Sequence, residues 1–111
     1  MNEYQEIIAS IVAEIHPEKI ILFGSRARGQ ARPDSDMDLL VIARSSEPRH
    51  RRSAKLYGVL SQFVAPMDII VYTPQEIEDW SAVPQAFITT AVREGKVLYE
   101  KPGGPGQKLA A

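Results

Sequence analysis

Apolar residues recur along the first fifteen positions at intervals of three and four. They are Tyr4, Ile7, Ile8, Ile11, Val12 and Ile15, and glutamate or glutamine fills several of the positions between them. This spacing predicts an amphipathic helix over residues 2–15. Because the residue before a proline avoids the helical region, the helix is expected to end near His16-Pro17.

Short apolar runs predict the strands. The run 20–23 ends at a glycine and is typical of a strand buried on both faces, and the run 37–43 predicts a second buried strand. Residues 67–72 predict a third strand with one carboxylate near its start, and 97–99 a short edge strand.

A longer helical pattern lies between the second and third strands. Leu56, Val59, Leu60, Phe63 and Val64 have helical spacing and predict one long helix over 49–64, broken by Ala65-Pro66. The basic residues at its start are expected to be solvated: Arg49, Arg51, Arg52 and Lys55. Without interleaved aromatic residues, this run is better interpreted as a solvated helix start than as a nucleic-acid patch.

Two further helices follow the third strand. Thr73, Pro74 and Glu76 have the spacing of a capping box with proline at the first helical position, which predicts a short helix ending near Trp80. A last helix is expected over 84–94, with Gly95 as its C-cap. Helices and strands alternate in the order αβ(α)βαβααβ. This order predicts an α/β (α+β) fold, a small mixed sheet flanked by helices.

Composition narrows the class of protein. A chain of 111 residues fits one domain, expected over 1–100, and the Pro-Gly-Gly-Pro-Gly segment predicts a disordered tail over 101–111. There is no cysteine, which excludes disulfides and thiolate chemistry. The formal net charge of −1 implies no bulk attraction to nucleic acid or to an anionic membrane. No apolar run approaches the length of a membrane span, so we expect a soluble, cytoplasmic protein.

The stretch that carries chemistry is Phe23-Gly24-Ser25-Arg26-Ala27-Arg28-Gly29, followed by Asp34-Ser35-Asp36-Met37-Asp38. The first part is a small-residue turn after a strand, where backbone N–H groups can face a phosphate. In a strand, residues two apart project from the same face, so Asp36 and Asp38 are expected to point the same way. A Walker A loop is excluded because Gly29 is followed by Gln30 rather than lysine. An EF-hand starting at Asp34 is excluded because Leu39 and Ser45 stand where glycine and glutamate are required.

The remaining pattern is Gly24-Ser25, ten residues, and then Asp36-x-Asp38. This spacing resembles the nucleotidyltransferase superfamily that includes DNA polymerase β. The sequences Gly-Ser-Arg-Ala-Arg-Gly and Asp-Ser-Asp-x-Asp-Leu resemble more closely the minimal nucleotidyltransferase (MNT) family, found as the antitoxin of HEPN–MNT toxin–antitoxin pairs. The resemblance covers residues 1–100 in element order, and its signature spans residues 24–41.

This resemblance implies a Mg²⁺-dependent transfer of AMP from ATP to a tyrosine hydroxyl of a HEPN-domain toxin. Asp36, Asp38 and Asp68 would hold two Mg²⁺ ions, and Asp68 would also draw the proton from the acceptor hydroxyl. Gly24 and Ser25 would bind the phosphates of ATP, with Arg28 or Arg26 as a clamp. Because 111 residues leave no room for a domain that binds the acceptor, a partner protein is expected to present it.

Simpler interpretations remain for each feature. Asp36 and Asp38 are also consistent with polar residues at the start of a strand, Asp68 with a turn after Pro66, and Arg26 and Arg28 with solvated surface. Two other functions stay open: a catalytically silent antitoxin that neutralises its partner by binding alone, and a transferase that acts on a small-molecule hydroxyl. Direct nucleic-acid binding is not expected.

Overall fold

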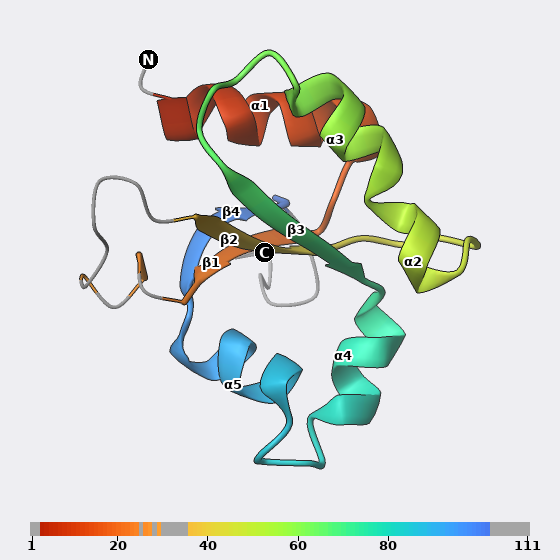
Figure 1. The fold of residues 1–111 in the computed structure, drawn as a ribbon. Helices are drawn as coiled ribbons and strands as arrows, with labels where there is room; N and C mark the ends of the chain where they lie inside the picture. Colours follow the sequence, from red (N-terminus) through yellow and green to blue (C-terminus); the bar gives the residue numbers. More distant parts are fainter. Residues whose placement is uncertain (1–2, 25, 28, 30–35, 103–111) are drawn as a thin grey trace.

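In a computed structural model of the chain, a sheet lies between two layers of helices (Figure 1). The structure describes residues 3–24, 26–27, 29 and 36–102. Within these residues, four strands have the order β3-β2-β1-β4. The elements along the chain are α1 (Glu3–Ile15), β1 (Lys19–Phe23), β2 (Met37–Ile42), α2 (Arg49–Arg52), α3 (Ala54–Leu60), β3 (Met67–Tyr72), α4 (Pro74–Trp80), α5 (Phe87–Glu94) and β4 (Lys96–Glu100). The predicted α+β fold with a mixed sheet is confirmed.

The central strand β2 pairs differently with its two neighbours. It runs antiparallel to β1, with Phe23 opposite Asp38, and parallel to β3, with Asp38 opposite Asp68. Consequently the end of β1 and the starts of β2 and β3 lie side by side, at one end of the strands. The strand β4 pairs with the other side of β1 and lies at the sheet edge, as predicted.

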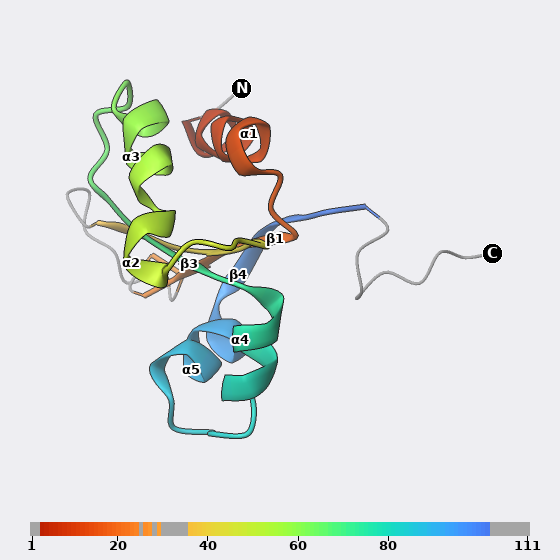
Figure 2. The same ribbon diagram turned by 90° about the vertical axis from the view of Figure 1, so that its right-hand side faces the viewer.

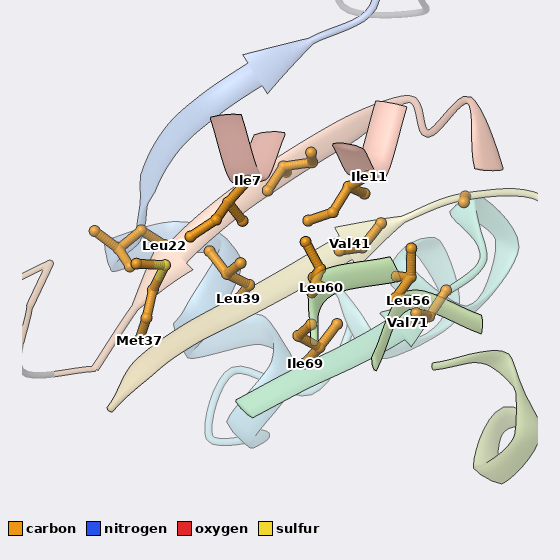
Figure 3. Packing of buried hydrophobic residues seen from close by; sticks show 12 residues of the cluster. Ile7, Ile11, Leu22, Met37, Leu39, Val41, Leu56, Leu60, Ile69 and Val71 are labelled. Atoms are coloured by element: carbon orange, nitrogen blue, oxygen red, sulfur yellow. The ribbon is translucent and has the colours of Figure 1, made fainter. Parts of the chain in front are cut away.

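The two faces of the sheet bury separate hydrophobic clusters, and Figure 2 shows a helical layer on each face. Helices α1 and α3 cover one face, where Ile7 and Ile11 pack with Leu39, Val41, Leu56 and Leu60 (Figure 3). Helices α4 and α5 cover the other face, where Ile88 and Ala91 pack with Ile21, Leu40 and Ile42. Because side chains alternate along β2, Asp38 shares its face with Leu40 and Ile42, on the side of α4 and α5.

The long helix predicted over 49–64 is wrong in two respects. The segment forms two helices, α2 and α3, which Ser53 separates, and α3 ends at Leu60. Arg52 is not solvated: its side chain is only 9% exposed and forms an ion pair with Glu76. It also donates hydrogen bonds to the backbone carbonyls of Glu47 and Val71. The periodicity of apolar residues does not reveal this, because the partner of Arg52 comes from a distant helix.

The helix predicted over 84–94 begins later, at Phe87, and ends with Gly95 in the C-cap position as expected. The reason for glycine differs from the expectation, because the φ of Gly95 is −75° rather than positive. A Cβ there would lie 2.5 Å from the carbonyl oxygen of Ala91 and 2.9 Å from that of Leu22. Gly95 therefore allows α5 to approach β1 closely. The capping box of Thr73 and Glu76 is confirmed.

In the part of the chain that the structure describes, none of the helices combines the length and the hydrophobicity that crossing a membrane requires. Most of the predicted tail over 101–111 lies outside the described residues.

Candidate functional site

The candidate site lies at the end of the sheet where β1 finishes and where β2 and β3 begin. Asp38 is the second residue of β2 and Asp68 the second residue of β3, and the two face each other in the parallel register. Neighbouring strands are about 4.8 Å apart, so the two aspartates start from adjacent backbone positions. The alternation along β3 places Asp68 with Ile70 and Tyr72, which pack on the α4 and α5 side. Asp38 and Asp68 therefore lie at the same end of the strands and on the same face of the sheet.

Gly24 lies against the side chain of Asp38. Its φ is +77°, a conformation that glycine adopts without strain, and it allows the chain to turn immediately after β1. A Cβ at Gly24 would collide with the Oδ2 atom of Asp38 and lie 3.3 Å from its Cγ. The glycine therefore serves two purposes, the turn and the space for Asp38, and only the first follows from the sequence.

The acidic side chains interact electrostatically. Burial raises the pKa of Asp38, and the charges of Asp68 and Asp36 raise it further. A raised pKa means that the protein disfavours the charged form of this carboxylate. A bound cation would remove the repulsion, so the pKa marks the site as a functional candidate.

The three aspartates predicted to bind metal differ in their exposure. Asp36 lies one residue before β2 and is exposed, as is Asp68, whereas Asp38 is half-buried. Among the described residues, no three carboxylate or imidazole side chains gather closely enough to hold a metal ion on their own. Magnesium needs fewer protein ligands, because it retains waters and binds the phosphates of its substrate. The hard oxygen atoms of adjacent Asp38 and Asp68 suit that ion, and Asp36 is near enough to influence Asp38.

The predicted phosphate-binding residues divide into described and undescribed ones. Gly24 is at the site, but Ser25, Arg28 and Asp34 lie outside the described residues. The side chain of Arg26 donates a hydrogen bond of 3.1 Å to the hydroxyl of Tyr4. Because Tyr4 belongs to α1 and packs on the opposite hydrophobic cluster, this contact connects Arg26 to α1.

A cavity of about 310 Å³ adjoins Asp38, and sequence reasoning missed it. Gly24 and Asp38 line one part of it, and helix α5 contributes Phe87, Thr90, Ala91 and Glu94. These four positions follow the i, i+3, i+4, i+7 spacing of one helix face. The spacing is visible in the sequence, but the sequence does not show that this face of α5 lies beside Asp38.

Comparisons with known proteins agree with the geometry. The sequence profile of a family described as "Polymerase beta, Nucleotidyltransferase" matches residues 5–103. A protein of Methanocaldococcus jannaschii, provisionally named protein adenylyltransferase MJ0141, is 28% identical over 71 residues. That match covers 64% of this chain and 70% of the relative.

Solved structures share the fold at lower sequence identity. A chain of a toxin–antitoxin crystal structure with AMP-PNP has a TM-score of 0.64 and 23% identity, covering 91% of this chain and 76% of that one. A provisionally identified nucleotidyltransferase of Sulfolobus solfataricus has a TM-score of 0.61 and 22% identity, covering 90% of this chain and 79% of that one. A mutant of the toxin–antitoxin MntA-HpeT has a TM-score of 0.56 and 21% identity, covering 92% of this chain and 76% of that one.

Proposed function

The chain belongs to the polymerase β nucleotidyltransferase family, and on that premise we propose that it transfers AMP from ATP to a hydroxyl group of a partner toxin. In this proposal the protein is the antitoxin of the pair, and the modification silences the toxin. The relative named as a protein adenylyltransferase supports a protein acceptor. The structural neighbours from toxin–antitoxin complexes support a toxin as that protein.

The observation that carries the proposal is the pairing of Asp38 with Asp68 beside Gly24. Two carboxylates from different strands meet next to a turn where only glycine fits. Because burial and like charge raise the pKa of Asp38, this arrangement is electrostatically unfavourable in the isolated protein. A structural role would favour a pairing with a cation from the protein itself, whereas a nucleotide site leaves the carboxylates available for Mg²⁺, which also binds the phosphates.

The proposed ligands for two Mg²⁺ ions are Asp36, Asp38 and Asp68, together with the triphosphate of ATP. When bound, such ions neutralise the phosphate charge and align the attacking and leaving oxygens. The carboxylates must be ionised to bind them.

The reaction itself is a substitution at the α-phosphorus of ATP. The acceptor oxygen forms a bond to that phosphorus, the bond to the β-phosphate oxygen breaks, and pyrophosphate leaves. The proton of the acceptor hydroxyl passes to the carboxylate of Asp68, which is exposed and therefore accessible to a group presented from outside. Gly24 contributes by allowing the phosphates to approach its backbone.

The finer details follow from the resemblance of residues 24–41 to MNT antitoxins. We propose that the partner is a HEPN-domain toxin and that the accepting hydroxyl belongs to a tyrosine. ATP is the proposed donor, in agreement with the AMP-PNP in one structural neighbour.

A catalytically silent antitoxin is the second candidate. One observation favours it: within the described part of the chain, the acidic residues are not gathered into a three-ligand metal group. In that case the protein would neutralise its partner by binding alone, and ATP would not be consumed.

A labelling experiment separates these functions. The protein is incubated with Mg²⁺, the product of the neighbouring gene and ATP labelled at the α-phosphate or, in parallel, at the γ-phosphate. AMP transfer places the α-label on the partner and leaves the γ-label in pyrophosphate. Tight binding of the partner without either label would support the silent antitoxin and refute the transferase. Label on the partner from γ-labelled ATP would indicate a kinase instead.

Controls connect the label to the site. Removal of Mg²⁺ with EDTA is expected to abolish labelling. Asp79→Asn is the matched control for substitutions of the acidic residues, because Asp79 is an exposed aspartate on α4 whose side chain contacts Gln75. This variant is expected to label the partner as the wild-type protein does.

A further inference from the structure

The cavity beside Asp38 is lined by carboxylate and apolar side chains. The carboxylates are Asp38 and Glu94, and the apolar side chains are Phe23, Ala27, Phe87 and Ala91. The base of a nucleotide is flat and largely apolar whereas its triphosphate is charged, so the apolar side chains suit the base. We propose that this cavity receives the nucleoside half of the donor nucleotide and that the base stacks on Phe87. This inference rests on the proposed function and specifies where its substrate binds.

Phe87 has the geometry of a stacking platform. It is the first residue of α5, and its side chain is 60% exposed although it lies beside the hydrophobic cluster on that face. Its ring contacts Phe23 edge to face, with centroids 5.4 Å apart and an angle of 78° between the planes. Phe23 therefore supports Phe87 from one direction, and much of the Phe87 ring stays accessible to a ligand. Aromatic rings in such positions bind bases with little preference among them.

Charge determines the orientation of the nucleotide in the cavity. Glu94 lines the cavity from the last turn of α5, and Asp38 lines it from β2. A triphosphate placed in the cavity would face carboxylates on two sides. Its favourable position is therefore at the start of β2 and β3, where Mg²⁺ would offset the charge. The uncharged nucleoside is the part that fits next to Glu94, whose oxygens can accept hydrogen bonds from ribose hydroxyls.

The size and position of the cavity also agree with the binding of a nucleoside. At about 310 Å³ it lies at the lower end of the range for small-molecule pockets, which suits a nucleoside rather than a complete nucleotide. A larger cavity of about 610 Å³ is lined by Arg52, Lys55 and Ala43. Ala43 follows the C-terminal end of β2, whereas Asp38 is near its start. The larger cavity therefore lies at the opposite end of the strands from Asp38.

Equilibrium binding tests the inference without the need for an acceptor. The affinities of ATP and of inorganic tripolyphosphate, both with Mg²⁺, are measured by calorimetry on the wild-type protein and on Phe87→Ala. Loss of the stacking surface is expected to weaken ATP binding about tenfold or more and to leave tripolyphosphate binding unchanged. Phe87→Tyr keeps an aromatic ring and is expected to restore ATP affinity. Trp80→Ala is the matched control, because it removes an exposed aromatic residue on α4 that does not line the cavity.

The outcomes distinguish the inference from the proposed function. Unchanged ATP affinity in Phe87→Ala, with ATP bound by the wild-type protein, overturns the inference and leaves AMP transfer intact. An equal loss for ATP and tripolyphosphate also overturns it, since the effect would then not depend on the base. A selective loss for ATP in a protein that never labels its partner supports the base site and rejects the transferase. If the wild-type protein does not bind ATP, neither proposal stands.

Discussion

Two charged groups at opposite ends of the sheet differ in how the protein treats their charge. At one end, Arg52 and Glu76 pair through two hydrogen bonds of 2.6 and 3.2 Å. The hydrogen bonds from Arg52 lower the pKa of Glu76, so the fold stabilises that charge. At the other end, burial and the neighbouring aspartates raise the pKa of Asp38. The fold therefore stabilises the ionised form of Glu76 and disfavours the ionised form of Asp38.

Under the proposed function, this difference separates a charge that stabilises the fold from a charge that binds a ligand. The Arg52–Glu76 pair connects α2 to α4 and completes its contacts within the protein, including the capping box at Thr73. The acidic residues at the other end place like charges next to one another. Like charges side by side cost stability, and a protein maintains such an arrangement where a cation or substrate compensates for it.

The largest expected effect is the loss of AMP transfer when the charge of Asp38 is removed. Asp38→Asn keeps the shape of the side chain and removes its charge, so we expect AMP transfer to fall about a thousandfold or more. The stability at neutral pH should not fall, because the substitution removes an unfavourable charge. Transfer is followed with α-labelled ATP and stability by thermal unfolding. Near-normal transfer by Asp38→Asn with Mg²⁺ would contradict the assignment of this residue to the metal site.

The second prediction concerns the space under Asp38. Gly24→Ala and Gly29→Ala introduce the same methyl group at glycines with φ values of +77° and +71°. Both substitutions are expected to cost about 1–2 kcal/mol of stability, because alanine is strained in this conformation. The methyl group at position 24 collides with Asp38, whereas none of the described residues lies within 4 Å of a methyl group at position 29. Displacement of Asp38 should reduce transfer about a hundredfold in Gly24→Ala alone.

The readout for this pair is the transfer rate per folded molecule, with circular dichroism to confirm folding. Equal loss of transfer in the two variants would show that strain in the turn, rather than the position of Asp38, controls the activity.

The third prediction tests the contribution of the Arg52–Glu76 ion pair to stability. Arg52→Met keeps much of the buried side chain but leaves Glu76 without its partner. We expect a loss of about 2–3 kcal/mol in the free energy of unfolding, somewhat less than for a fully buried pair because the side chain of Glu76 is 29% exposed. Urea unfolding measures the loss. Arg51→Met is the control, since the neighbouring Arg51 is exposed. A similar loss in both variants would mean that net charge rather than the ion pair is responsible.

The smallest expected effect is on the pH dependence of stability. Glu76 has a lowered pKa, so its contribution is present above the unfolded-chain pKa of about 4.3 and is lost as the pH falls through the folded pKa. Asp38 has a raised pKa, so its contribution is present below about 3.9 and is lost as the pH rises through the folded pKa.

Glu76→Gln should therefore weaken the loss of stability in acid, and Asp38→Asn should steepen it. Urea unfolding between pH 3 and pH 6 measures both slopes. Changes in the same direction would show that the two carboxylates do not experience opposite environments.

The sequence predicted most of the local structure, because local rules govern it. The bounds of β3 at Met67 and Tyr72 and the capping box at Thr73 were predicted correctly. The motif that contains Gly24, Asp36 and Asp38 was also visible, because its residues are close together in the chain. The single helix over 49–64 was wrong because the apolar spacing begins only at Leu56, so it contains no information on residues 49–53, and the chain forms a separate helix before Ser53.

The sequence by itself determined where most of the helices and strands lie and which carboxylates are candidates for chemistry. The tertiary structure alone decided that Asp68 stands opposite Asp38, that Arg52 pairs with Glu76 and that Phe87 lines the same cavity as Asp38. Each of these three contacts joins residues at least 24 positions apart in the chain. Such contacts depend on strand register and helix packing, which the whole core determines, so no local pattern of residues reveals them.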